Sequence, residues 1–236
     1  MINHQENINQ DEVDKFNRLA NDWWDSNGPL RTLHDINPAR LNYITGKVAL
    51  KGRRVLDVGC GGGVLTEALA RGGARVQGLD ASDDVVRVAR QHARENSLEI
   101  DYIAGKLEDF ASENPDCFDV LTCMELLEHV PDPGALLQTC ARLLRPGGDL
   151  ILSTINRNLK SYLSTIIGAE RVFGLLPEGT HDYGAFIRPS ELDRWLRTAH
   201  FNVMDIRGML YLPGLRYCAL TNDPGVNYLV HARLDS

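Results

Sequence analysis

Residues 55–63 read Val-Leu-Asp-Val-Gly-Cys-Gly-Gly-Gly, and this stretch decides the fold. An apolar strand runs directly into a glycine-rich turn, and a helical pattern of leucines and alanines follows it. Glycines at the end of a strand let a bulky ligand approach the backbone, and the first turn of a helix presents free N–H groups. A second apolar stretch, residues 75–79, leads to Asp80, about 20 residues beyond Gly59, where an acid can bind ribose hydroxyls. The pattern therefore predicts a site for a nucleoside-containing cofactor.

Two residues of this stretch distinguish between the possible cofactors. A dinucleotide site requires glycine or alanine at the position that Val64 occupies. Asp57, just before Gly59, would place a negative charge beside a pyrophosphate, whereas it suits a ligand that carries an amine. S-adenosylmethionine has an amine, a sulfonium and an adenosine but no phosphate. We therefore favour S-adenosylmethionine over a nicotinamide or flavin dinucleotide.

The composition restricts the class of protein and its partners. A chain of 236 residues with 43% hydrophobic residues can bury a full core. The net charge of −7 and the pI of about 5.5 argue against a nucleic-acid partner, which would select a basic surface. The first residues, Met-Ile-Asn-His-Gln-Glu-Asn, are too polar for a secretory signal, and no apolar run is long enough to span a bilayer. We expect a cytoplasmic protein, either free or peripheral on the inner membrane.

Strand and helix patterns alternate from residue 53 onward. Strands are expected at 53–58, 74–79, 100–104, 117–123 and 149–155, and helices near 62–72, 83–96 and 134–144. Further along, a helix is expected to open at Pro189, and strands at 202–212 and 226–233 are joined by a turn-rich stretch. This alternation predicts the α/β class, with a doubly wound, seven-stranded, mostly parallel sheet.

Two further regions complete a single expected domain over residues 1–236. Residues 1–50 are expected to form N-terminal helices: the apolar spacing over 10–25 is helical, and Asn37-Pro38 has the pattern of the cap and first turn of a second helix. Residues 156–186 interrupt the alternation and form an insertion that could cover a substrate or contact a membrane. Within it, residues 159–176 are amphipathic, which is typical of a membrane-surface helix or of an ordinary packed helix.

Several short motifs outside the glycine-rich turn are more specific. They are Trp23-Trp24-Asp25, Asn37-Pro38-Ala39-Arg40, Met124-Glu125-Leu126-Leu127-Glu128-His129, Arg145-Pro146-Gly147-Gly148 and Gly179-Thr180-His181-Asp182. Through these motifs the chain resembles class I S-adenosylmethionine-dependent methyltransferases, and more narrowly the UbiG-type O-methyltransferases of ubiquinone biosynthesis. The glycine-rich turn is shared by the wider class and carries no information about the substrate.

The resemblance implies S-adenosylmethionine as the methyl donor and assigns four residues to its site. Gly59 would bring the backbone close to the methionyl portion, Asp80 would accept hydrogen bonds from the ribose hydroxyls, and Met124 would lie beside the transferable methyl group. Arg40 would pair with the methionyl carboxylate, for which a guanidinium fork is well shaped. The alternative for Arg40 is a surface cation at a helix end. Many class I enzymes carry an acid for adenine where this chain has Lys106, so the adenine contact stays open.

Methyl transfer to a phenol needs assistance, because a phenol with a pKa near ~10 is mostly protonated at neutral pH. Glu125, Glu128 and His129 follow the fourth expected strand and, if helical, project from one face. They could ligate a divalent cation such as magnesium, which would lower the pKa of the phenol. His129 could instead be a catalytic general base, or the motif could be structural, and the sequence does not separate these roles. His34 and His181 are further candidate bases.

The resemblance implies O-methylation of polyprenylated phenols and quinols in ubiquinone biosynthesis, at both O-methylation steps. Its other implied partners are a membrane lipid surface, where such substrates reside, and a ubiquinone-synthesis complex. Two alternatives stay open. One is an O-methyltransferase for another small phenol, and the other is a non-catalytic, cofactor-binding adaptor of such a complex.

Overall fold

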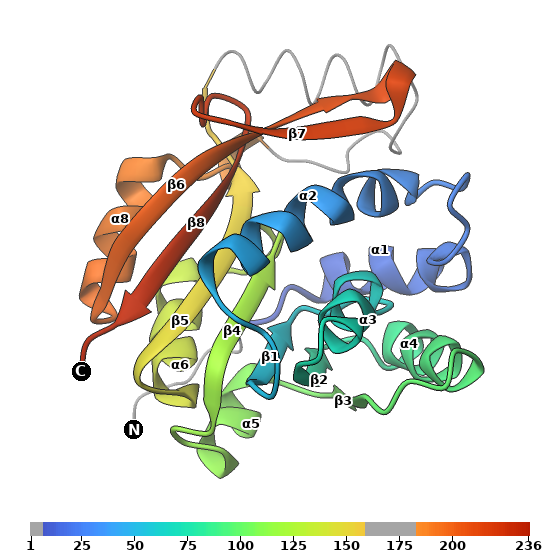
Figure 1. Ribbon diagram of the computed structural model, residues 1–236, viewed down its shortest axis with the longest axis horizontal. Helices are drawn as coiled ribbons and strands as arrows, with labels where there is room; N and C mark the ends of the chain where they lie inside the picture. The colour runs from blue at the N-terminus through green and yellow to red at the C-terminus, as the bar shows by residue number, and fades with distance from the viewer. Residues whose placement is uncertain (1–6, 159–182) are drawn as a thin grey trace.

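The computed structural model describes residues 7–158 and 183–236. The described residues form eight strands: β1 (Arg54–Val58), β2 (Arg75–Asp80), β3 (Asp101–Ala104), β4 (Phe118–Met124), β5 (Leu144–Ile155), β6 (Phe201–Leu212), β7 (Tyr217–Thr221) and β8 (Asn227–Leu234). Their order in the single sheet is β3-β2-β1-β4-β5-β8-β6-β7 (Figure 1). Strands β1 to β5 pair in parallel, and β8, β6 and β7 are added antiparallel. Because the strand order reverses at β1, the ends of β1 and β4 border the crevice in which such sheets bind ligands.

Helices cover both faces of this sheet (Figure 1). One face carries α2 (Arg31–Lys47), α3 (Val64–Arg71) and α4 (Asp83–Glu95), and the other carries α5 (Leu107–Glu113), α6 (Pro133–Leu143) and α8 (Pro189–Thr198). The alternation of side chains along the strands separates the two cores. Val55 and Val120 pack with residues of α2 and α3, whereas their neighbours Leu56 and Leu121 pack with residues of α5, α6 and α8.

The predicted α/β class and the doubly wound, mostly parallel sheet are confirmed. Seven strands were predicted, but the described residues form eight. The additional strand is β7, which pairs with β6 after a short 3-10 turn, η5 (Pro213–Leu215). The chain reverses there because Arg216 adopts a left-handed backbone conformation with φ of +49°. The sequence pattern showed only the later turn at residues 221–225, so it placed β7 in a connection.

Helix α2 begins at Arg31, and the prediction that Asn37-Pro38 opens it was wrong. Pro38 lies inside the helix, where it cannot donate to the carbonyl of His34 four residues earlier. Asn37 does not cap the helix either, because its Nδ2 donates to the carbonyl of Val64 at 3.1 Å. Tertiary contacts with the start of α3 therefore override the local signal of this dipeptide.

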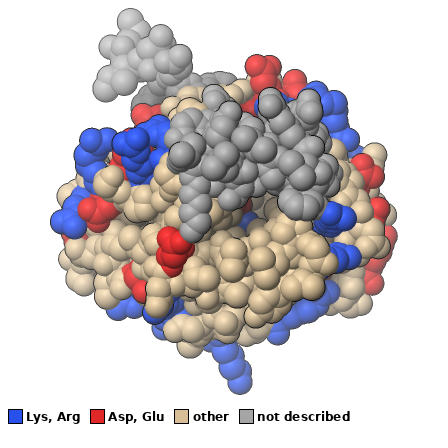
Figure 2. Space-filling model, turned by 90° about the horizontal axis from the view of Figure 1, so that it is seen from above, with Lys and Arg blue, Asp and Glu red and all other residues tan. Residues whose placement is uncertain are grey.

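The insertion predicted at 156–186 lies mostly outside the described residues, and its amphipathic stretch 159–176 lies wholly outside them. None of the helices in the described ranges is both long and apolar enough to cross a bilayer. Exposed large apolar side chains gather at one place in these ranges, the hairpin of β6, η5 and β7, where they are Leu210, Leu212, Leu215 and Tyr217. Figure 2 looks onto the end of the molecule that carries this hairpin, and uncharged residues cover much of that view.

Candidate functional site

Packing partners shape the glycine-rich turn between β1 and α3. Gly59 has φ of +67°, and a Cβ at this position would lie 2.9 Å from the side chain of Leu126. A Cβ on Gly61 or Gly62 would lie 2.2 or 2.3 Å from the ring of Trp23. No larger residue fits without displacing these neighbours. Trp23 thus covers Gly61 and Gly62, whereas Gly59 keeps a partly exposed backbone in the cavity wall.

Asp80, at the end of β2, is hydrogen bonded to the same turn. Its Oδ2 accepts from the N–H of Gly61 at 2.9 Å, and its Oδ1 accepts from the N–H of Ser82 at 2.9 Å. Burial raises the pKa of Asp80, although these backbone hydrogen bonds oppose the shift. Each carboxylate oxygen has a further lone pair, so the geometry is compatible with the predicted acceptance of ribose hydroxyls.

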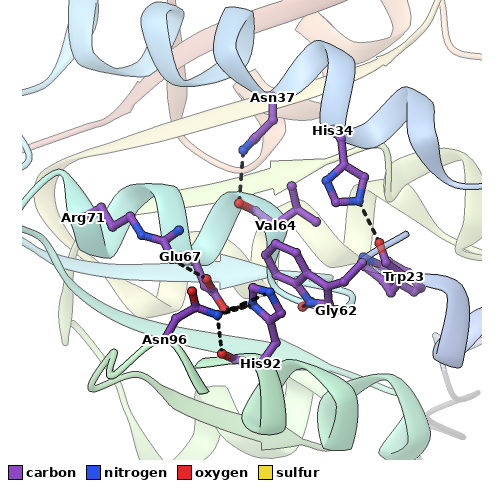
Figure 3. A network of polar contacts seen from close by, with 10 residues as sticks. Trp23, His34, Asn37, Gly62, Val64, Glu67, Arg71, His92 and Asn96 are labelled. Carbon is purple, nitrogen blue, oxygen red and sulfur yellow. Dashed lines mark hydrogen bonds and ion pairs between the residues drawn. The ribbon is translucent and has the colours of Figure 1, made fainter. Parts of the chain in front are cut away.

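Trp24 ties the N-terminal segment to α3 and α4. Its Nε1 donates to the carbonyl of Gly62 at 2.9 Å, and its ring stacks on His92 with centroids 3.4 Å apart. His92 in turn contacts Glu67 at 2.6 Å, and Glu67 pairs with Arg71 at 3.1 Å (Figure 3). The paired tryptophans therefore have different neighbours: Trp23 covers the glycine-rich turn, and Trp24 anchors it from outside.

Asp57 lies beneath the turn, with 2% of its surface exposed. Its two oxygens accept hydrogen bonds from the hydroxyls of Thr122 and Thr66, each at 2.6 Å. Burial raises the pKa of Asp57 to about 6, although the threonine hydroxyls oppose the shift. Asp57 is therefore a buried carboxylate whose closest partners are neutral.

A cavity of about 750 Å³ lies at the carboxyl ends of β1, β2 and β4. All four predicted cofactor residues line it: Arg40, Gly59, Asp80 and Met124. The N-terminal helix α1 (Gln10–Leu19) contributes Glu12, Val13 and Phe16, and β6 contributes Met209, Leu210 and Tyr211. The structure thus brings the predicted cofactor residues together in one compartment that also has an apolar wall. The volume is in the range of cofactor and drug-sized ligand sites.

Arg40 is buried, with 5% of its surface exposed, so the alternative of a surface cation is wrong. Its Nη2 lies 3.2 Å from Oε1 of Glu125. Both Nε and Nη2 are buried, and neither has a hydrogen-bond partner among the described residues. A buried guanidinium with unused donors is costly unless a ligand completes it, and a carboxylate is the ligand whose shape fits best.

Glu125 directly follows β4 and lines the cavity. Its backbone is left-handed, with φ of +52°, which turns the chain sharply after Met124. The carboxylate accepts a hydrogen bond from Ser153 at 2.6 Å and lies 3.3 Å from the amide Nδ2 of Asn227. With Arg40 beside it, Glu125 is held by three neighbouring elements, α2, β5 and β8.

Glu128 and His129 lie in a short 3-10 turn, η2 (Leu127–His129), and not in an α-helix. The expectation that Glu125, Glu128 and His129 project from one helical face is therefore wrong. Glu128 accepts from Thr154 at 2.8 Å, and burial, followed by the charge of Glu125, raises its pKa to about 8. Glu128 is not among the residues that line the cavity, whereas His129 is.

These three residues do not fit a divalent cation well. Among residues 7–158 and 183–236, no group of three histidine, cysteine or acidic side chains is placed to hold a metal ion. Glu125 is engaged by Arg40 and Ser153, and Glu128 has its carboxyl group behind the cavity wall.

Helix α1 covers the cavity and, together with Asn7 just before it, is attached to the segment that follows β4. Nδ1 of His129 lies 2.8 Å from Oε2 of Glu12, and the ring of Phe16 meets that of His129 edge-on at 5.4 Å. Burial pushes the pKa of Glu12 up, but hydrogen bonds from Lys15 and His129 hold it below its usual value. Asn7 exchanges two hydrogen bonds with the backbone of Asp132 just beyond, at 2.8 and 2.7 Å.

The remaining candidates are placed away from the centre of the site or outside the described residues. His34 contacts the backbone carbonyl of Trp23 at 2.8 Å and is not part of the cavity wall. His181 lies outside the described residues. Lys106 precedes α5 and is not among the residues that line the cavity. Leu107 and Glu108 do line it, so Glu108 is an acid at the start of α5 that the sequence analysis did not assign.

Sequence reasoning also missed Glu12, Asn37 and Asn227 as wall residues. Glu12 lies 117 positions from His129 and Asn227 lies 102 positions from Glu125, so no local spacing connects them. Asn37 did have a signal, because it belongs to the Asn-Pro-Ala-Arg motif. The motif was interpreted as a helix start, and only Arg40 was assigned.

Comparison with known proteins shows the family to which this chain belongs. A family model described as a methyltransferase domain matches residues 30–206. The ubiquinone biosynthesis O-methyltransferase of Xanthomonas campestris pv. campestris is 52% identical over 226 residues, which cover 96% of this chain and 95% of that protein. The protein of the same name from Hahella chejuensis is 50% identical over 227 residues, with the same coverage of 96% and 95%.

Solved structures support the fold. The magnesium protoporphyrin IX methyltransferase of Synechocystis PCC 6803 with bound SAH superposes with a TM-score of 0.69 at 22% identity, over 96% of this chain and 99% of that one. The [4+2]-cyclase SpnF superposes with a TM-score of 0.62 at 18% identity, over 84% and 80%. The same fold thus occurs in proteins named for different reactions, so these likenesses are evidence for architecture alone.

Proposed function

Because this chain belongs to the family of ubiquinone biosynthesis O-methyltransferases, we propose that it transfers a methyl group from S-adenosylmethionine to a hydroxyl of polyprenylated phenols and catechols. The proposed substrates are those of both O-methylation steps, 2-polyprenyl-6-hydroxyphenol and 3-demethylubiquinol. The observation that carries the proposal is that one cavity joins the glycine-rich turn and Asp80 to an apolar wall from β6. A cofactor and an aromatic acceptor can therefore meet in one compartment.

The chain's own residues suit this cofactor. S-adenosylmethionine supplies a methyl group activated by a sulfonium. Asp80 would accept from the ribose hydroxyls, Gly59 would allow close approach of the backbone, and Met124 would pack near the methyl group. Arg40 would use Nε and Nη2, which make no hydrogen bond to the described residues, for the methionyl carboxylate.

His129 is the proposed general base. Its Nδ1 lies against the carboxylate of Glu12, so Nδ1 is the hydrogen-bond donor and the lone pair of the neutral imidazole is on Nε2. Nε2 would take the phenolic proton as the oxygen attacks the methyl carbon and the C–S bond breaks. His129→Ala should therefore slow turnover strongly, while cofactor affinity falls by no more than the few-fold loss expected when the contact with Glu12 is broken.

A chelator tests whether methylation requires a divalent cation. If Glu125, Glu128 and His129 recruited an ion with the substrate, EDTA should abolish methylation and magnesium should restore it. The separate partners of these residues favour activity that survives chelation.

Product analysis tests the function as a whole. Isotope-labelled S-adenosylmethionine is incubated with a short-tailed demethylubiquinol and, separately, with a short-tailed 2-prenyl-6-hydroxyphenol, and labelled methyl ethers are identified. Methylation of both compounds supports both steps. Methylation of unrelated catechols alone would favour a different small-phenol enzyme. Tight cofactor binding without release of S-adenosylhomocysteine from any phenol would favour an adaptor of a synthesis complex.

The proposal includes contact with a lipid surface, where a polyprenylated substrate resides. It is supported by the exposed apolar side chains of the β6–β7 hairpin, because Leu210 of the same strand also lines the cavity. A tail held at such a surface would have a short path to the site. Residues 159–176 stay a second proposed contact.

A further inference from the structure

Asn37 and Arg40 lie three positions apart on α2, so both side chains project from one side of the helix. Both residues line the cavity. Pro38 lies between them, inside the helix. The pair therefore presents an amide and a guanidinium to the same compartment from one rigid element.

The orientation of the Asn37 amide is determined by its neighbour. Nδ2 donates to the carbonyl of Val64 at 3.1 Å, at the start of α3 (Figure 3). This bond leaves Oδ1 as the other end of the amide, and Oδ1 is buried without a hydrogen-bond partner among the described residues. A buried acceptor without a partner costs free energy unless a ligand donates to it, and Asn37 is one of the residues that line the cavity.

Arg40 supplies hydrogen-bond donors, whereas Asn37 supplies an acceptor. The Nε and Nη2 of Arg40 are buried donors without hydrogen-bond partners among the described residues, and its ion-pair partner Glu125 is already held by Ser153. An unused acceptor thus lies beside unused donors on one helix face. An α-amino acid matches both, because its ammonium donates, its carboxylate accepts, and the two groups are attached to the same carbon atom.

We propose that Asn37 binds the α-ammonium group of the cofactor's methionyl end, while Arg40 binds its carboxylate. The inference rests on the proposed use of S-adenosylmethionine and extends it to a residue with no assigned role. Asp57 is the other acid near the turn, but both its oxygens already accept from threonine hydroxyls. Thr32 Oγ1 and Asn227 Oδ1 also line the cavity without a partner among the described residues, but the amide oxygen of Asn37 is the unsatisfied amide acceptor on the same side of α2 as Arg40.

Ligands that differ only at the amino-acid end test this role by calorimetry. The set is S-adenosylhomocysteine, its analogue without the α-amino group, and methylthioadenosine, which lacks the whole amino-acid end. Asn37→Ala should weaken S-adenosylhomocysteine by about tenfold to a hundredfold, the range for a hydrogen bond to a charged group. The same variant should bind the deamino analogue and methylthioadenosine as the unmodified protein does.

Two further variants separate binding from scaffolding. Asn37→Asp keeps an acceptor but loses the donor to Val64, so it should recover most of the affinity for S-adenosylhomocysteine. Asn42→Ala changes an exposed asparagine on the same helix and should alter no affinity. Thermal unfolding of each variant verifies that it is folded.

The outcomes are distinct. An equal loss for all three ligands would make Asn37 an anchor of α3 only, and unchanged S-adenosylhomocysteine binding would remove it from the site. Either result overturns the inference while the proposed function stands. If the unmodified protein binds none of the three ligands, the proposed cofactor fails together with the inference.

Discussion

Asp80 has two roles at the end of β2, because the oxygens proposed to bind ribose also hold the N–H groups of Gly61 and Ser82. Asp80→Ala should therefore weaken binding of S-adenosylmethionine by roughly 1–3 kcal/mol, the cost of removing a charged hydrogen-bond partner. Calorimetry measures this loss. Asp84→Ala, which removes an exposed acid from α4, is the control. Equal affinities for Asp80→Ala and the unmodified protein would exclude Asp80 from the site.

The burial of Glu128 makes folding stability depend on pH. Its pKa is about 8 in the folded protein and 4.5 when exposed, so between these values the folded state binds more protons than the unfolded state. Folding stability should therefore fall as pH rises from about 4.5 to 8, by at most about 1.4 kcal/mol per pH unit from this group.

The neutral isostere Glu128→Gln should remove that loss. Relative to the unmodified protein, its melting temperature should improve steadily between pH 6 and pH 8 and then level off, as measured by thermal unfolding in matched buffers. A difference that does not change with pH would show that Glu128 is already ionised in the folded protein.

Among the elements, the central strands and helices were predictable because their signals are local. The strand, turn and acid around Gly59 and Asp80 stand close in sequence, and the side-chain alternation of buried strands is strong. The start of α2, the strand β7 and the 3-10 turn at His129 were not predictable in this way. Pro38 is tolerated because contacts with α3 hold the helix, and the turn at Arg216 requires a positive φ at a residue that rarely adopts it.

Helix α1 is held by contacts with residues that are distant in the sequence, such as His129, and this attachment can be tested. Glu12→Gln keeps the size of the side chain but removes the charge that faces His129. Because α1 covers the cavity, we expect S-adenosylhomocysteine to dissociate about fivefold faster, which corresponds to about 1 kcal/mol for a partly buried charged contact.

Stopped-flow fluorescence can follow the release, because Trp23 lines the cavity. Asp14→Asn is the matched control, since it makes the same charge change on an exposed position of α1. If both variants release the ligand at the rate of the unmodified protein, then α1 does not limit exchange.

At the scale of the whole molecule, the strand order places a crevice and an apolar hairpin at the same end of the sheet. The reversal at β1 creates the crevice for the cofactor, and the antiparallel strands β6 and β7 extend beyond it with an apolar hairpin. Side chains alternate along β6, so Met209 is buried in the core and its neighbour Leu210 is half exposed. An amphiphilic acceptor could therefore keep its tail outside the protein while its ring enters the cavity.

The proposed lipid contact can be tested on the hairpin. Leu212, Leu215 and Tyr217 are exposed by 39%, 75% and 57%, and the hairpin needs none of these side chains for its own core. Replacing all three by serine should release most of the protein from liposomes in a sedimentation assay. Methylation of a soluble short-tailed catechol should continue at the same rate, because the strand pairing of β6 and β7 is maintained by backbone hydrogen bonds.

Met204→Ser provides the control, since Met204 is 53% exposed on β6 but lies outside Gly208–Leu212, the part of β6 that pairs with β7. A parallel variant with serine at Ile166, Ile167 and Phe173 tests the amphipathic stretch 159–176. Apolar insertion should lose little strength in high salt, whereas attraction between basic side chains and anionic lipids should largely disappear. Full retention of the hairpin variant on liposomes, together with release of the 159–176 variant, would assign the lipid contact to that stretch instead of to the hairpin.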